Sequence, residues 1–111
     1  MSFGEQLIAW RRELHQNPEL SGQEVETTAR LRQWLTNAGI TPLPYELSTG
    51  LVAEIGTGKK LIALRADIDA LPVEERSGVA FSSQRAGVMH ACGHDIHTSV
   101  ILGAALKLKE R

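Results

Sequence analysis

The chain has 111 residues, which is enough for one domain or for part of one. Hydrophobic residues make up 42% and charged residues 23%, as in ordinary globular proteins, and the net charge of −1 gives no sign of a nucleic-acid partner. The sequence has no apolar run long enough to span a bilayer, no signal-peptide pattern, and one cysteine, which cannot form an internal disulfide. We therefore expect a cytoplasmic protein without membrane or nucleic-acid partners.

Two helices are predicted near the N-terminus. Ser2 and Glu5 form a capping-box pattern at the start of a helix from about Phe3 to Gln16. Residues 21–24, Ser-Gly-Gln-Glu, predict a second capping box, followed by a helix that runs to about Ala38. The residues expected on the buried face of this second helix are Val25, Leu31, Leu35 and Ala38.

Two groups of ionisable residues have a simple structural interpretation. His15 lies at the end of the first predicted helix, where the negative end of the helix dipole favours a protonated imidazole. From this pattern alone we expect His15 to cap the helix rather than to take part in chemistry. Glu74, Glu75 and Arg76 lie in a polar loop and are expected to form a solvated charged run.

Two strands are predicted in the middle of the chain. Residues 51–55 and 60–66 have strand-like apolar patterns, and the short turn between them favours an antiparallel hairpin. Residues 61–64 are continuously apolar, which indicates a central strand covered on both faces. Together with the helices, this alternation predicts an α/β sandwich with helices on the faces of the sheet.

Asp67 and Asp69 directly follow the second predicted strand. Ligand sites in open α/β sheets lie at the carboxyl ends of strands, where a carboxylate can bind a metal ion or orient a histidine that does. Aspartate is also common where a strand ends in a turn. The pattern alone supports the two interpretations about equally.

Residues 89–97, Met-His-Ala-Cys-Gly-His-Asp-Ile-His, hold the only cysteine and three of the four histidines. Cys92 and His94 are separated by one glycine, so a thiolate and an imidazole can reach one metal ion or two adjacent ones. A buried helix is predicted from Ile96 to Lys109 with Asp95 as its N-cap, and its dipole favours the thiolate of Cys92. A lone cysteine is more often a small buried hydrophobe, but the neighbouring histidines favour a functional site.

Several segments together resemble the amidohydrolase branch of the aminoacylase and carboxypeptidase family of di-metal peptidases, metallopeptidase family twenty. The segments are Arg12–His15 with Asn17–Ser21, Leu64–Pro72, Met89–His97 and Leu102–Ala105. The branch includes hippurate hydrolases, N-acyl-amino-acid hydrolases and plant auxin-conjugate hydrolases. The order and spacing of the segments also fit, and the likeness runs through nearly all of the chain.

The resemblance implies a zinc-peptidase-like three-layer α/β/α sandwich with a mixed sheet, of which residues 1–111 form the N-terminal part. In that family, a Glu-Glu pair that includes the general base, two further histidines, and a lid and dimerisation domain come from later sequence. We therefore expect a homo-oligomeric parent protein and a 111-residue chain that is inactive alone. Residues 107–111 carry no helix stop signal, so the chain is expected to end within an element.

The resemblance also implies roles for the clustered residues. Cys92 and His94 would be metal ligands, and the thiolate of Cys92 would bridge two divalent metal ions, which could be zinc, manganese, nickel or cobalt. Asp69 would orient a ligand rather than bind a metal. The residues that would support the ligands without binding the metals are Asp67, His90 and His97.

The implied function is metal-dependent hydrolysis of the amide bond of an N-acyl or N-aroyl amino acid by a metal-activated water. Two alternatives remain open. One is a cysteine-nucleophile amidase in which Cys92 works with a nearby histidine. The other is a non-catalytic metal-binding module, which needs at least three good ligands within these residues.

Overall fold

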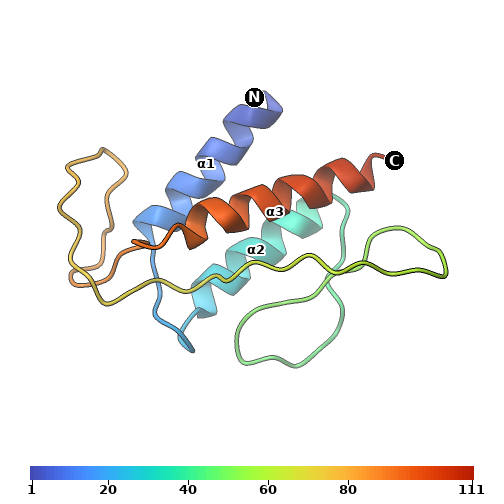
Figure 1. The fold of residues 1–111 in the computed structure, drawn as a ribbon, viewed down its shortest axis with the longest axis horizontal. Helices are drawn as coiled ribbons and strands as arrows, with labels where there is room; N and C mark the ends of the chain where they lie inside the picture. The colour runs from blue at the N-terminus through green and yellow to red at the C-terminus, as the bar shows by residue number, and fades with distance from the viewer.

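The computed structural model describes all 111 residues and contains three helices. Helix α1 is Phe3–Gln16, α2 is Val25–Asn37 and α3 is His94–Lys109, and long loops join them (Figure 1). The first two helices are confirmed, as is the capping box at Ser2, whereas α3 begins earlier than the predicted Ile96. None of the three has both the length and the hydropathy that crossing a membrane requires.

The start of α2 is stabilised by a residue outside the predicted cap. The capping box expected at Ser21 is wrong, because the N-cap is Glu24 and its side chain makes no capping hydrogen bond. Instead, the buried carboxylate of Glu19 accepts hydrogen bonds from the amides of Glu26 at 3.2 Å and Thr27 at 2.6 Å. A negative charge that binds the first free amides of a helix satisfies them and complements the helix dipole.

Helix α3 begins after a glycine and not at the predicted aspartate cap. Gly93 is the N-cap and has a φ of +95°, in the left-handed region that favours glycine. Asp95 is the second residue of the helix, and its carboxylate bonds two side chains of α1, so the prediction of Asp95 as N-cap is wrong. The left-handed residue separates the loop that carries Cys92 from the helix that begins at His94.

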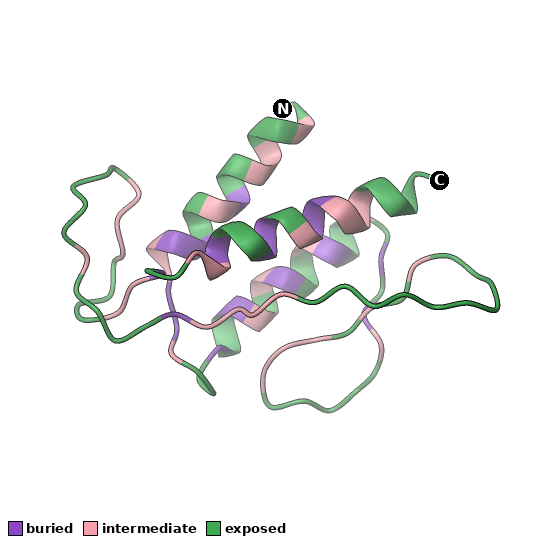
Figure 2. Ribbon diagram, in the orientation of Figure 1, coloured by how far each residue is buried: buried purple, intermediate pink, exposed green.

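The three helices share one apolar core. Its buried members are Trp10, Leu31, Leu35, Ile40 and Leu102. Figure 2 shows buried positions where the helices face one another and mostly exposed loops. The predicted buried face of α2 is confirmed at Leu31 and Leu35 but wrong at Val25, which is exposed. Helices α1 and α3 approach closely at Gly103, where an added Cβ would lie 3.0 Å from the side chain of Leu7.

The predicted hairpin is wrong, since the structure contains isolated β-bridges but no strand. Ala53, in the first predicted strand, bridges Pro42 instead of residues 60–66. Residues 54–69 make no backbone-to-backbone hydrogen bond. A two-stranded hairpin is marginal in water unless its apolar faces are covered, and these residues find no such cover. The 111 residues are therefore helical with almost no strand, and the three-layer sandwich is not present within them.

Two of the bridges hold the segment that follows Asp69. Ala70 pairs with Leu20 in parallel, and Leu71 pairs with Met89 in antiparallel orientation. The amides of Leu71 and Met89 each donate to the other residue's carbonyl oxygen at 2.9 Å. Three segments that are distant in the sequence therefore lie side by side, and the loop with the clustered cysteine and histidines starts directly after Met89.

Exposed apolar side chains in the unpaired segment predict self-association of the isolated chain. Leu61, Ile62 and Leu64 are 81%, 91% and 57% exposed. An extended apolar segment with unpaired backbone groups is a template for pairing with another chain. We expect the 111-residue chain to form oligomers in sedimentation velocity, and Ile62→Lys to weaken them.

The matched control is Val25→Lys, which places the same charge on an exposed apolar position of a helix whose backbone is already paired. That control is expected to leave the oligomers unchanged. An unaltered chain that stays monomeric at all concentrations would contradict the prediction.

Candidate metal centre

His94 is held by a residue that follows the predicted second strand. Its Nδ1 donates a hydrogen bond to the backbone oxygen of Asp69 at 2.9 Å and lies 3.0 Å from Oδ1 of the same residue. Both acceptors are oxygens, so Nδ1 carries a hydrogen, and in the neutral imidazole Nε2 keeps its lone pair. A carboxylate on one nitrogen and a free lone pair on the other is the usual arrangement of a metal-binding histidine.

Cys92 is a free, exposed cysteine one glycine away from His94. No hydrogen bond engages its sulfur, so the thiol is available to an ion. Thiolate and imidazole together favour zinc and similar transition metals over calcium or magnesium. The chemistry of this donor pair therefore fits a zinc-like divalent ion.

The donor pair has no third partner among the 111 residues. No group of three His, Cys, Asp or Glu side chains is placed so that it could hold a metal ion. Asp67 comes nearest, with Oδ2 3.9 Å from Nε2 of His94, but its carboxylate also pairs with Arg65. Structural zinc sites have four protein ligands and catalytic sites have three, so the donors described here make up only part of a site.

The other two histidines of the motif differ in environment. His90 is buried, and neither of its ring nitrogens has a hydrogen-bond partner. Burial lowers the pKa of His90 below its ordinary value, although the negative charge of Asp95 acts in the opposite direction. His97 is exposed, and its ring centroid lies 6.2 Å from that of His94. The roles predicted for His90 and His97 stay predictions.

A buried charge cluster lies next to the motif, and sequence patterns did not indicate it. Oδ2 of Asp95 accepts hydrogen bonds from Nε of Arg11 and Nδ1 of His15, both at 2.8 Å. Nε2 of His15 lies 2.9 Å from Oε2 of Glu75. The side chains of His15, Asp95 and Glu75 are only 3%, 1% and 4% exposed. The expectations of a capping His15 and a solvated Glu75 are therefore wrong.

Glu75 ties its loop to α1 as an ionised carboxylate. Burial acts to raise the pKa of Glu75, but the hydrogen bonds from Ser77, His15 and the Ser83 amide, together with the charge of His15, lower it to about 2. The Ser77 hydroxyl and the Ser83 amide lie at 2.5 Å and 2.6 Å from the carboxylate. Phe81 strengthens the attachment, because its ring lies under the guanidinium of Arg11 with 4.9 Å between the cation and the ring centroid.

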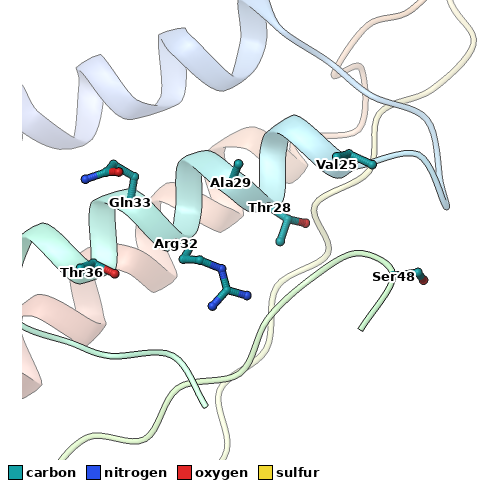
Figure 3. A pocket seen from close by; sticks show the side chains of 7 residues that line it. All are labelled: Val25, Thr28, Ala29, Arg32, Gln33, Thr36 and Ser48. Atoms are coloured by element: carbon teal, nitrogen blue, oxygen red, sulfur yellow. The ribbon is translucent and has the colours of Figure 1, made fainter. Parts of the chain in front are cut away.

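Two cavities can be compared as ligand sites. One of about 320 Å³ is lined by the charge cluster, by His90 and by apolar residues of the loop and α3. The other, of about 430 Å³, lies along α2, where Figure 3 shows Arg32 and Ser48 across an open space. Arg32 is the only charged residue that lines this second cavity, which contains no cysteine, histidine or carboxylate. Only the first cavity therefore adjoins metal-binding chemistry.

Residues 63–111 match a family model, peptidase family M20/M25/M40. The N-acetyl-L-cysteine deacetylase of Bacillus subtilis is 54% identical over 107 residues, which are 95% of this chain and 26% of that protein. The N-acyl-L-amino acid amidohydrolase of Geobacillus stearothermophilus is 46% identical over 101 residues, which are 89% of this chain and 27% of that protein.

The crystal structure of the Bacillus subtilis YXEP protein, a dinuclear metal-binding peptidase from the M20 family, superimposes with a TM-score of 0.95 at 50% identity. The match covers 98% of this chain and 31% of that one. This chain belongs to the M20/M25/M40 peptidase family. The family resemblance in the sequence is thus confirmed, and the M20-family chain spans between about a quarter and a third of the length of these relatives.

The lowered pKa of Glu75 predicts a pH-dependent contribution to the stability of the chain. The folded-state pKa of about 2 lies below the ordinary value of 4.5, so the unfolded chain takes up the proton more readily. The contribution is therefore present above pH 4.5 and is lost as the pH falls towards 2. We expect Glu75→Gln to lower the free energy of unfolding above pH 4.5 and to have a shrinking effect below it, as measured by urea titrations.

The matched control is Glu46→Gln, which changes an exposed glutamate that makes no side-chain hydrogen bond. The difference between this variant and the unaltered chain is expected to stay near zero at every pH. If the effect of Glu75→Gln were the same at all pH values, the ionised contact would not contribute as described.

Proposed function

We propose that this M20-family chain is the N-terminal part of a catalytic domain that hydrolyses the amide bond of N-acyl or N-aroyl amino acids. The observation that supports the proposal most directly is the contact between Nδ1 of His94 and Asp69, which leaves Nε2 without a hydrogen bond, and the exposed Cys92 lies two residues earlier in the sequence. Two relatives, an N-acetyl-L-cysteine deacetylase and an N-acyl-L-amino acid amidohydrolase, act by their names on acylated amino acids.

Cys92 and His94 would hold two divalent metal ions, with the thiolate of Cys92 shared between them. Zinc, manganese, nickel and cobalt are all candidates for such a donor set. When bound, the ions would lower the pKa of a water molecule and polarise the amide carbonyl. Asp69 would keep the His94 ring in one orientation and raise the basicity of its Nε2, as carboxylates do for metal-bound histidines.

The general base of the reaction would come from a carboxylate elsewhere in the protein. The carboxylates near the motif are already engaged by cationic or donor groups: Asp69 by His94, and Asp95 by Arg11 and His15. A general base must accept a proton from the attacking water, and a carboxylate that already accepts a hydrogen bond from a histidine or an arginine is poorly placed to do so. The role of this chain is therefore to present and orient ligands rather than to move the proton.

The two alternative functions receive less support from the geometry. A cysteine nucleophile needs a histidine within hydrogen-bond reach, but no hydrogen bond joins Cys92 to a histidine, and Nδ1 of His94 is occupied by Asp69. A self-contained metal-binding module needs three ligands, and the 111 residues hold no such group. The metal-dependent amidohydrolase accounts for both observations.

The donor roles can be tested by substitution in the protein that carries this chain. Cys92→Ser is expected to cause a sharp loss of bound metal and of activity, because a serine hydroxyl ionises poorly and is a weak ligand for soft metals. His94→Ala should have the same effect. The measurements are elemental analysis after gel filtration and turnover of an N-acyl amino acid.

His90→Ala serves as the control, because His90 bonds neither proposed ligand. It is expected to leave the metals bound, with a loss of at most about 10–100-fold in affinity. Normal metal content in Cys92→Ser would remove Cys92 from the site. Chelator-insensitive activity that alkylation of Cys92 abolishes would instead favour the cysteine nucleophile.

A second prediction concerns the 111-residue chain by itself. Because it holds two of the proposed donors, and the carboxylates of Asp69 and Asp95 beside the motif are already engaged, we expect no turnover that is sensitive to chelators, even with added zinc or manganese. The control is the protein that carries the chain, assayed under the same conditions. Chelator-sensitive hydrolysis by the isolated chain would show that these residues complete a site of their own.

A further inference from the structure

We propose that His15 is a positioning residue for the metal site, and that it acts through Asp95 on the first turn of α3. The inference rests on the proposed function, because it takes Cys92 and His94 as metal ligands. His15 makes no hydrogen bond to either of them. Its effect on the site would be transmitted by the one carboxylate that adjoins His94 in the sequence.

His15 connects two other parts of the chain to α1. It lies in the last turn of α1, is 3% exposed, and uses both ring nitrogens. Nδ1 lies 2.8 Å from Oδ2 of Asp95, and Nε2 lies 2.9 Å from Oε2 of Glu75. Hydrogen bonds between an imidazole and a carboxylate are short and directional, so the ring fixes both partners relative to α1.

The start of α3 is anchored on two sides. His94 is bound to Asp69, whereas its neighbour Asp95 is bound to His15 and Arg11 on α1. Consecutive helical residues point about 100° apart around the helix axis. The Thr98 hydroxyl, one turn further along, donates to the backbone oxygen of Asp67 at 3.0 Å and so holds the same side of α3 as the contact to Asp69. The contacts of Asp95 are the polar contacts that tie the first turn to α1, and together the two sets fix its rotation.

The apolar core cannot replace this anchor. Its member on α3 is Leu102, and the close contact at Gly103 also lies further along the helix. These contacts hold α1 and α3 together without setting the direction of Cys92 and His94. A displacement of a ligand by about 1 Å can weaken a metal site strongly, so a small rotation of the first turn of α3 would lower the affinity for the metal.

The test uses His15→Gln in the protein that carries this chain, loaded with Co²⁺ as a spectroscopic probe. Glutamine keeps a hydrogen-bonding side chain but cannot hold two carboxylates in fixed directions. We expect about a 10–100-fold loss of Co²⁺ affinity and a changed thiolate-to-cobalt absorption band. Asp95→Asn, which weakens the same contact from its other end, should give the same loss.

Two controls separate positioning from general stability. Leu31→Ala removes part of the core and should lower the melting temperature while Co²⁺ affinity and the absorption band stay unchanged. Glu13→Gln, on α1, breaks an exposed ion pair with Arg30 of α2 and should change neither property. If His15→Gln lowered stability as Leu31→Ala does and left the cobalt band unaltered, His15 would be a structural residue only.

A double-variant comparison tests the route through Asp95. In an Asp95→Asn background, His15→Gln should cause no further loss of affinity, and additive losses would overturn the proposal. If His15→Gln failed to fold, unaltered Co²⁺ affinity in Asp95→Asn would overturn it equally. Metal retention in Cys92→Ser would instead refute the proposed function, so the two failures are distinguishable.

Discussion

The buried carboxylate of Asp95 is the constraint on which the arrangement of the motif depends. A carboxylate that is 1% exposed is strongly destabilising unless cations or donors surround it, and here both of its side-chain donors come from α1. The start of α3 must therefore lie against the end of α1. Because Gly103, further along α3, packs against Leu7 and Phe3, nearer the start of α1, the two helices are antiparallel, and the loop with Cys92 emerges where the start of α3 meets the end of α1.

Local patterns predicted the helices because the information that forms them is local. The capping box at Ser2 and the apolar residues on the buried face of α1 all lie within or next to this one helix, so a short stretch of sequence is enough to predict it. The end of α2 is local too: Gly39 has a φ of +81°, and the amide of Ile40 bonds the carbonyl of Leu35 at 2.9 Å, which closes the helix and brings two core residues together.

The contacts that the sequence did not reveal join residues far apart in the chain. Glu19 replaces a local cap on α2, and Asp95 binds residues 80 or more positions away instead of capping α3. One signal was present: Arg11 and His15 follow Leu7 at intervals of four along one face of α1, so both point towards the core. A histidine on the buried face of a helix needs polar partners, but no local sequence pattern shows which residues those partners are.

The incomplete donor set and the unpaired apolar segment are connected through one stretch of backbone. Residues 60–66 run directly into Asp67 and Asp69, and Asp69 orients His94. Partners that paired this segment would also fix Asp69, and through it the direction of Nε2. Conversely, a metal ion held by His94 and further ligands would restrain the segment. Under the proposed function, metal binding and the pairing of residues 60–69 would be coupled, as expected when ligands are brought together only by the folded chain.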